Sequence, residues 1–253
     1  MRTGIIIQAR LGSTRLPRKM ILPFFDNQGI LEILLIRLKE VINEKVTPII
    51  LATTTNPIDD ELQKIGDKLG IFTVRGSEND VLERFIDAAE KHNITNIIRV
   101  CADNPLLDLA KLLQLIERSE KSEVDYCSFS TSESKPTILT SYGFWAEAVS
   151  LEALKKVAVV TDERIYHEHV TNYVYKHPDQ FTVAYKLIKP EIEKEENIRL
   201  TVDTQSDFDL VKVIYKDLID CKVEFNAEKI VKHIGSRPDW METMKTEILA
   251  NKK

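Results

Sequence analysis

The residues between Arg10 and Lys19 carry the sharpest chemical signal in this chain of 253 residues. A Gly-Ser-Thr segment in this stretch is surrounded by four cations: Arg10, Arg15, Arg18 and Lys19. Glycine permits close backbone approach, and backbone N–H groups, hydroxyls and cations together can bind phosphate oxygens. The pattern is neither a Walker A motif nor a dinucleotide-binding turn. It favours a triphosphate site, and a solvated basic loop is the alternative.

Two carboxylates form the second signal. Asp103 and Asp203 each follow an apolar segment that is expected to be a strand. If they converge near the phosphates, their hard oxygen atoms suit Mg²⁺, which would offset charge during phosphoryl or nucleotidyl transfer. The alternatives are structural, because Asp203 could cap the following helix and Asp103 could form a turn before Asn104-Pro105.

Other polar groups give weaker signals. His167-Glu168-His169 lies on an expected helix, where adjacent positions do not share a face, so the segment is a poor metal clamp. His169 is a candidate for binding a carboxylate or hydroxyl substrate. Tyr142 and Glu147 are candidates for an acceptor pocket, although an aromatic cluster here is as consistent with packing.

The elements expected to position these groups alternate between strands and helices. Apolar segments typical of buried strands are followed by segments with helical spacing, which indicates a largely parallel sheet covered on both faces. We expect strands at 4–8, 48–53, 71–74, 96–101, 126–130, 181–187 and 198–202, and helices at 29–45, 59–69, 79–92, 109–119, 151–157, 163–174 and 208–218, with a surface helix after 234. Ligands of such sheets bind beyond the carboxyl ends of the strands, where the basic loop and Asp103 lie.

Composition excludes several classes of protein. With 43% hydrophobic residues the chain can form a core, and a net charge of −5 argues against a globally basic nucleic-acid binder. Its three cysteines form no CxxC pair and no disulfide framework, and Cys101 is expected to pack as a small hydrophobe. The apolar run near the N-terminus contains three isoleucines, too short for a signal peptide or a membrane span. We expect a soluble cytoplasmic protein that binds neither nucleic acid nor membrane.

The segment Ile5–Lys19 resembles the opening of the spore-coat-polysaccharide-type cytidylyltransferases, which are related to the CMP-3-deoxy-manno-octulosonate and CMP-acylneuraminate synthetases. The resemblance continues, in chain order over roughly residues 4 to 218, through Leu51–Thr55, Val74–Arg84, Arg99–Pro105, Glu168–Thr171 and Leu200–Phe208. It implies an α/β, Rossmann-like nucleotide-diphospho-sugar transferase fold. It also implies a single domain over residues 1–253, with 130–190 as a smaller acceptor or dimerisation subregion, and a homodimer.

The resemblance also implies a reaction in which CTP and a sugar acid or sugar-like acceptor give an activated product and pyrophosphate, for surface polysaccharide or glycoconjugate synthesis. Position by position, it assigns the nucleotide and its phosphates to Ala9, Arg10, Gly12 and Ser13, the base or ribose to Arg75, Gly76, Ser77 and Asp80, the triphosphate and leaving group to Arg15 and Lys19, and Mg²⁺ to Asp103 and Asp203. Arg15, Lys19 and Asp103 would be catalytic. Tyr142, Glu147, Glu168 and His169 are the acceptor candidates.

Three positions depart from the family pattern. Relatives usually have glycine where this chain has Ala102 and Arg18, and proline where it has Gln205. Each departure leaves the neighbouring acid or cation in place. Two other functions stay open: a sugar-nucleotide-dependent glycosyltransferase, although Asp103 lacks the usual DxD context, and a catalytically silent nucleotide-binding module.

Overall fold

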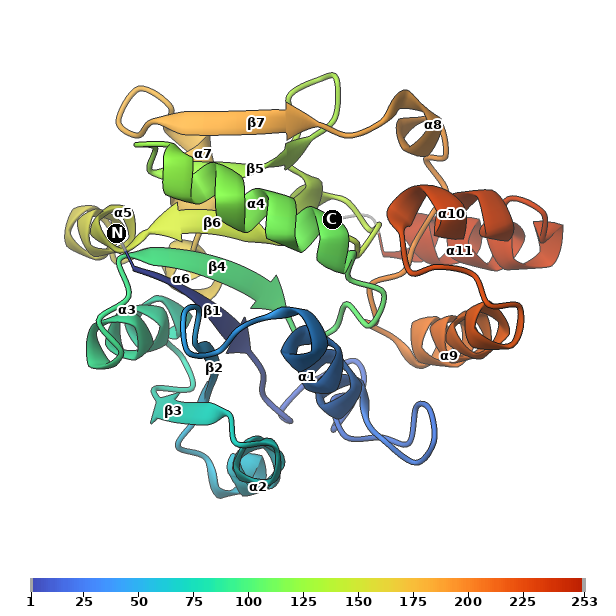
Figure 1. Cartoon of the computed structure of the whole chain (residues 1–253), viewed down its shortest axis with the longest axis horizontal. Coiled ribbons are helices and arrows are strands. Elements are labelled where there is room, and N and C mark those ends of the chain that lie inside the picture. Colours follow the sequence, from blue (N-terminus) through green and yellow to red (C-terminus); the bar gives the residue numbers. More distant parts are fainter. Residues whose placement is uncertain (1, 252–253) are drawn as a thin grey trace.

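A seven-stranded sheet forms the centre of the protein in the computed structural model, which describes residues 2–251 (Figure 1). Its strands run in the spatial order β3-β2-β1-β4-β6-β5-β7. They are β1 Thr3–Gln8, β2 Ile49–Thr54, β3 Phe72–Gly76, β4 Asn96–Cys101, β5 Tyr126–Ser130, β6 Glu147–Ser150 and β7 Val183–Leu187. All neighbouring pairs are parallel except the two that involve β6. The predicted α/β class with a mostly parallel sheet is confirmed.

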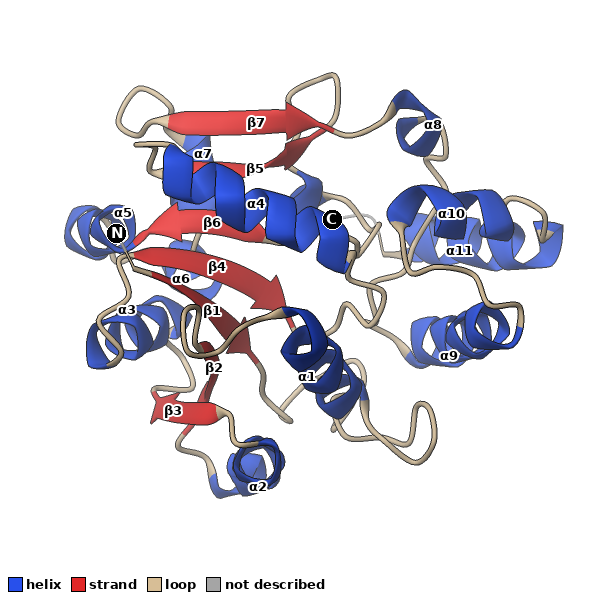
Figure 2. Ribbon diagram, in the orientation of Figure 1, coloured by secondary structure: helices blue, strands red, loops and turns tan. Residues whose placement is uncertain are grey.

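Helices flank this sheet (Figure 2). The α-helices are α1 Ile30–Val41, α2 Asp60–Leu69, α3 Val81–Lys91, α4 Leu109–Lys121, α5 Leu151–Val160, α6 Arg164–Glu168, α7 Asn172–Lys176, α8 Pro190–Glu193, α9 Gln205–Asp220, α10 Ala227–Ile234 and α11 Pro238–Ala250. Side-chain caps begin several of them, because a polar residue before the first turn satisfies backbone N–H groups that have no partner within the helix. Asp80, Asp108 and Thr204 do so for α3, α4 and α9. None of the helices in residues 2–251 is long and apolar enough to cross a bilayer.

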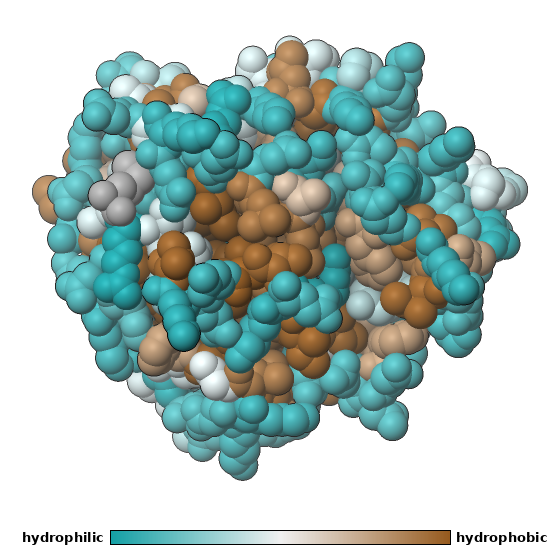
Figure 3. Space-filling view, viewed as in Figure 1, coloured by the Kyte–Doolittle hydropathy of each residue, from teal (hydrophilic) through white to brown (hydrophobic). Residues whose placement is uncertain are grey.

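Two hydrophobic cores lie on the two faces of the sheet. Side chains of α3, α5 and α7 pack in one core, whereas α1, α4 and α9 to α11 contribute to the other, larger one. Alternating residues of β1 divide between them, since Ile5 and Ile7 face the larger core and Ile6 faces the smaller one. On the face seen in Figure 3, apolar residues reach the surface near the centre, where α1 and α4 cover the sheet.

Two sequence predictions of secondary structure are wrong, and β6, α8 and α10 were not predicted. Residues 198–202 form no strand; Leu200 and Val202 are buried in the larger core and their N–H groups donate to Ser141 and Asp103 instead of to a sheet neighbour. The helix expected over 163–174 is two short helices, α6 and α7, separated at 169–171. Strand β6 was not predicted, because it begins with a charged residue, Glu147, although it lies inside the sheet. Glu147 can be buried there because it pairs with Arg99 of β4.

Gly143 is a position where this fold requires glycine. Its φ is +71°, and an added Cβ would lie 3.2 Å from the carbonyl of Leu200. We expect Gly143→Ala to lower the free energy of unfolding by about 1–2 kcal/mol, because side chains are strained in the left-handed region. Gly235→Ala is the control, since Gly235 has a helical φ of −58° and an added Cβ would approach no atom closer than 3.4 Å. Urea denaturation measures the free energy of unfolding of both variants, and equal losses in the two would contradict the prediction.

Candidate active site

The basic loop and Asp103 lie beyond the carboxyl ends of β1 and β4. These strands are hydrogen-bonded neighbours, with Gln8 opposite Cys101, so the loops that follow them start side by side. From β1 the chain leads to β2 and β3 on one side, and then crosses to β4 on the other. This is the point of an open parallel sheet at which adjacent loops diverge and leave a crevice for ligands.

Lys19 brings the two predicted carboxylates together. Its Nζ lies 3.1 Å from Oδ2 of Asp103 and 3.6 Å from Oδ1 of Asp203, and it donates to the carbonyl of Val202 at 2.6 Å. The Lys19 side chain is only 9% exposed, so this ammonium group depends on those oxygens for its solvation. The structure therefore confirms that Asp103 and Asp203 converge, which spacing in the sequence could not establish.

Asp203 is held in place from the opposite side. Thr204, not Asp203, caps α9, and Asp207 completes the capping box. The buried Asp207 pairs with Arg199 at 2.7 Å and accepts the backbone N–H of Asp203 at 3.0 Å. The expectation that Asp203 serves only as a cap is wrong. Its side chain is left to face Lys19 and Arg15, whose Nη2 lies 2.8 Å from Oδ1 of Asp203.

The remaining cations of the basic loop also face carboxylates. Arg10 lies 3.5 Å from Glu168, which brings this acceptor candidate of α6 beside the nucleotide candidates. Arg18 pairs with Glu61 of α2 through both carboxylate oxygens, at 2.7 and 2.8 Å. With Arg15 and Lys19, each of the four loop cations thus has an acidic partner from a different segment.

Asp59 is a site residue that sequence reasoning missed. It is 1% exposed, and its Oδ1 accepts the backbone N–H of Leu11 at 2.7 Å while Oδ2 accepts the hydroxyl of Thr54. A buried carboxylate must be satisfied in this way. Asp59 therefore fixes the start of the basic loop to the end of β2. In the sequence, Asp59 is the first residue of the helix expected over 59–69, and no local pattern distinguishes it from an ordinary acid of a first helical turn.

The loop after β3 contains the residues predicted to contact base or ribose. Arg75 donates to the carbonyls of Thr54 and Asn56 at 2.7 and 2.9 Å and pairs with Asp60 at 2.7 Å. These contacts fix Arg75 to the loop that follows β2. Ser77 accepts the N–H of Asp80 at 3.2 Å, which tightens the turn into α3.

Arg84 stabilises this loop through a hydrogen bond, and sequence reasoning did not identify it as part of the site. Its side chain is fully buried, and its Nη1 donates to the carbonyl of Ser77 at 2.6 Å. Gly76 has to be glycine here, because an added Cβ would lie 2.8 Å from Cγ of Arg84. On the opposite side, Glu78 lies 3.3 Å from the position that a Cβ of Gly12 would take. The loop after β3 therefore lies against the basic loop, so the structure brings Gly12 next to the predicted base-contacting segment.

The acceptor candidates are divided between different surroundings. Glu147 is 1% exposed and forms a buried cluster with Arg99, Thr171 and Tyr126, with 2.6 Å between its Oε2 and Nη1 of Arg99. Tyr142 is buried in the larger core, with its ring edge-on to Trp145. Glu168 lies beside the basic loop, and His169 ends α6. The structure thus brings Glu168, but not Tyr142, to the predicted nucleotide loop.

Other reactive groups lie elsewhere or are inert. Burial raises the pKa of Cys101 to about 11, so its thiol stays protonated, in agreement with its expected packing role. In residues 2–251, one group of three potential metal ligands has its donor atoms within 4.8 Å: Asp217, Cys221 and His233. It joins α9 to α10, and Asp217 is already paired there with Arg237.

His167 is a pH-sensitive support for Asp80. Its Nδ1 lies 2.6 Å from Oδ2 of Asp80 and its Nε2 lies 2.9 Å from the carbonyl of Thr161. Partial burial opposes protonation, but the Thr161 carbonyl and the Asp80 carboxylate outweigh it and raise the pKa of His167 above its ordinary value. The protonated histidine therefore stabilises the folded protein, fully below the unfolded pKa of about 6.5, and this stability is lost as pH rises through the folded pKa.

We expect His167→Gln to reduce the free energy of unfolding most at about pH 5.5 and least at about pH 8.5. His92→Gln is the control, because burial, Lys91 and Arg2 lower the pKa of His92 and reverse the sign of the dependence. Urea denaturation across this range measures both. A loss for His167→Gln that is independent of pH would contradict the assignment.

Two known proteins are similar to this chain in sequence over most of their length. The chain is 40% identical over 220 residues to the uncharacterised protein MJ1063 of Methanocaldococcus jannaschii, with 86% of each chain covered. It is 30% identical over 239 residues to the spore coat polysaccharide biosynthesis protein SpsF of Bacillus subtilis, with 92% of this chain and 94% of SpsF covered.

Solved structures are also similar to this chain. A cytidylyltransferase of Leptospira borgpetersenii superposes with a TM-score of 0.82 at 29% identity, over 95% of this chain and 97% of that one. A CMP:2-keto-3-deoxy-manno-octonic acid synthetase complexed with CTP shares the fold, with a TM-score of 0.64 at 13% identity, over 86% of this chain and 99% of that one. The family model of the cytidylyltransferases matches residues 4–230. The chain therefore belongs to the cytidylyltransferase family of nucleotidyltransferases.

Proposed function

We propose that the protein is a Mg²⁺-dependent cytidylyltransferase that transfers CMP from CTP to a small sugar acid or sugar-like acceptor and releases pyrophosphate, for the synthesis of surface polysaccharide or glycoconjugate. The observation that carries the proposal is the convergence of Asp103 and Asp203 on Lys19 within a loop of four cations. The likeness to SpsF and to a synthetase solved with CTP supports the choice of nucleotide and acceptor.

The residues present suit a divalent cation. Asp103 and Asp203 come from segments 100 residues apart, yet each has an oxygen within 3.6 Å of the same buried ammonium group. A position that stabilises one cation between two carboxylates has the charge and the hard oxygen donors that Mg²⁺ prefers. Asp103 and Asp203 would hold the metal, which would offset the negative charge that develops during transfer.

The protein's own residues supply positioning and charge neutralisation. The acceptor oxygen attacks the α-phosphorus in line, the bond to the β-phosphate oxygen breaks, and pyrophosphate leaves with the electron pair. Arg15 and Lys19 stabilise the triphosphate and then the leaving pyrophosphate. Ala9, Arg10, Gly12 and Ser13 hold the nucleotide through backbone and side chain. Such transfer requires little covalent chemistry from the enzyme, so geometry and electrostatics account for the rate.

The second loop and α6 complete the proposal. Gly76, Ser77 and Asp80 bind base or ribose, with Arg75 as the residue that fixes this loop to the end of β2. Glu168 and His169 bind the acceptor next to Arg10, and the buried Glu147 and Tyr142 shape the region behind them. Residues 130–190 serve acceptor binding or homodimer formation within a single domain, and the enzyme works in the cytoplasm.

Nucleotide binding is the first prediction of this proposal. We expect CTP with Mg²⁺ to stabilise the protein by about 2.7 kcal/mol at a hundredfold excess over its Kd, and more than UTP, GTP or ATP. A thermal-shift series with the four nucleotides, each with and without Mg²⁺, measures this. A shift with a nucleoside diphosphate sugar and none with any triphosphate would contradict the proposal and indicate a glycosyltransferase.

Asp103→Asn tests the metal role. We expect pyrophosphate release from CTP to fall by about a hundredfold or more, because the substitution removes charge where a cation must be held. Asp220→Asn is the control, since Asp220 is exposed on α9 and pairs only with Lys216 in the same helix. The assay uses a panel of sugars and sugar acids as acceptors. Near-normal metal-dependent turnover in Asp103→Asn would exclude the proposed role.

A further inference from the structure

Arg18 stands in a backbone conformation that favours glycine. Its φ is +60°, in the left-handed region where side chains are strained. The same residue closes the basic loop, because its N–H donates to the carbonyl of Leu11 at 3.0 Å. This chain therefore keeps the left-handed turn while carrying a side chain that opposes it.

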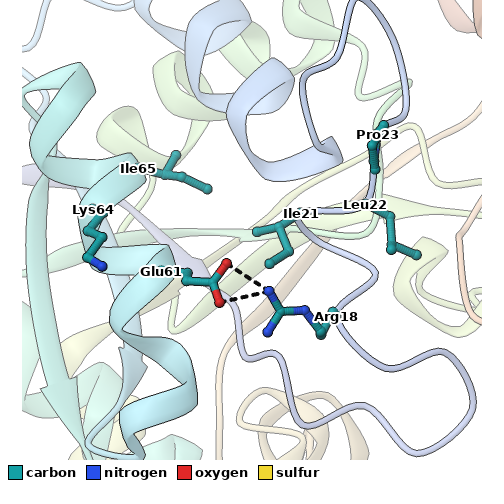
Figure 4. Close-up of a pocket in the computed structure, with 7 residues that line it drawn as sticks. All are labelled: Arg18, Ile21, Leu22, Pro23, Glu61, Lys64 and Ile65. Atoms are coloured by element: carbon teal, nitrogen blue, oxygen red, sulfur yellow. Dashed lines mark hydrogen bonds and ion pairs between the residues drawn. The ribbon is translucent and has the colours of Figure 1, made fainter.

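The Arg18 side chain has a partner that compensates. Its Nη2 donates to both carboxylate oxygens of Glu61, at 2.7 and 2.8 Å, and Figure 4 shows the two side chains meeting between the basic loop and α2. A cavity of about 480 Å³ lies here, lined on one side by the chain that follows the loop and on the other by α2: Arg18, Ile21, Leu22, Pro23, Glu61, Lys64 and Ile65. The ion pair thus connects the two sides of this cavity.

The left-handed turn directs the neighbouring side chains to opposite sides. Lys19 reaches Asp103 and Asp203 in the active site, whereas Arg18 reaches away from it to α2. A shift of the turn at residue 18 would therefore move the next residue, Lys19, which is the group that holds the two carboxylates together. Glu61 has no direct contact with Lys19 and acts on it through Arg18.

We propose that Glu61 is a positioning residue for catalysis, which holds Arg18 in the strained turn and thereby fixes Lys19 against Asp103 and Asp203. The ion pair offsets the backbone strain that a glycine at residue 18 would avoid. Glu61 is therefore needed only while residue 18 carries a side chain. This inference rests on the proposed function for its catalytic meaning, but the loop geometry can be tested without nucleotide.

The test is a double-mutant cycle between Glu61→Gln and Arg18→Gly, with Arg18→Ala as the matched control. Hydrogen exchange of the peptide over residues 9–20 is measured without ligand, relative to the peptide of α4. Affinity for CTP with Mg²⁺ is measured by calorimetry. We expect Glu61→Gln and Arg18→Ala each to speed exchange in the loop and to weaken CTP binding about two- to fivefold, the range that a half-exposed ion pair supplies.

Glycine should restore the loop. We expect Arg18→Gly to match the wild type in hydrogen exchange of the loop, and Glu61→Gln to have no further effect on exchange or on CTP affinity in the Arg18→Gly background. Equally fast loop exchange in Arg18→Gly and Arg18→Ala, or an undiminished effect of Glu61→Gln beside Arg18→Gly, would overturn the proposal. If the wild type does not bind CTP, the proposed function fails, whereas the exchange measurements still decide the role of Glu61.

Discussion

The active site depends on one buried ammonium group. Lys19 is almost inaccessible to water, and its Nζ is solvated by Asp103, Asp203 and the Val202 carbonyl. Removing either carboxylate would leave a charge underpaired in a place where desolvation is costly. The chain has therefore built two further supports around this group: the Arg199–Asp207 pair behind Asp203, and Asp59 at the start of the loop. Asp59 comes from the segment after β2, and Arg199 and Asp207 come from the segment before α9 and from its first turn, so the site depends on parts of the chain about 140 residues apart.

Much of the fold could be predicted because hydrophobic periodicity reports burial. Strands β4 and β5 were predicted with the bounds that they have, and the first four helices were found within a few residues of their observed ends. Hydrophobic periodicity failed where a buried segment pairs with no strand, and where a strand contains a buried charge. Residues 198–202 alternate because Leu200 and Val202 enter the larger core while Arg199 turns to Asp207, and no strand pairs with them. Strand β6 contains a buried carboxylate, whose partner Arg99 no local pattern reveals.

The site was predictable in its residue types but not in its contacts. The cations of the basic loop and the two strand-end acids were evident from local sequence. Their pairing was not, because Arg15 and Asp203 are 188 residues apart. The crossover from β3 to β4 places Asp103 beside the loop after β1, and the N–H of Val202 donates to the carbonyl of Asp103, which brings Asp203 to the same place. The departure from the family pattern at Gln205 is explained by its position in the fold. Gln205 is the first residue of α9, the position at which the proline of relatives is favoured, so either residue serves there.

The ion pairs of the loop cations affect how a triphosphate and a metal would bind. Arg10, Arg15, Arg18 and Lys19 each face a carboxylate, and the two carboxylates assigned to the metal are the partners of Arg15 and Lys19. In the proposed function, a triphosphate that engages these two cations would draw them away from Asp103 and Asp203. Asp203 would keep only Arg199, whose Nη2 lies 3.5 Å from its Oδ2, and Asp103 would lose its partner Lys19. A divalent cation would supply the missing positive charge, whereas without the nucleotide it would be repelled by the nearby Lys19 and Arg15. On the proposed function, the binding free energies of nucleotide and metal would therefore be coupled through the same ion pairs.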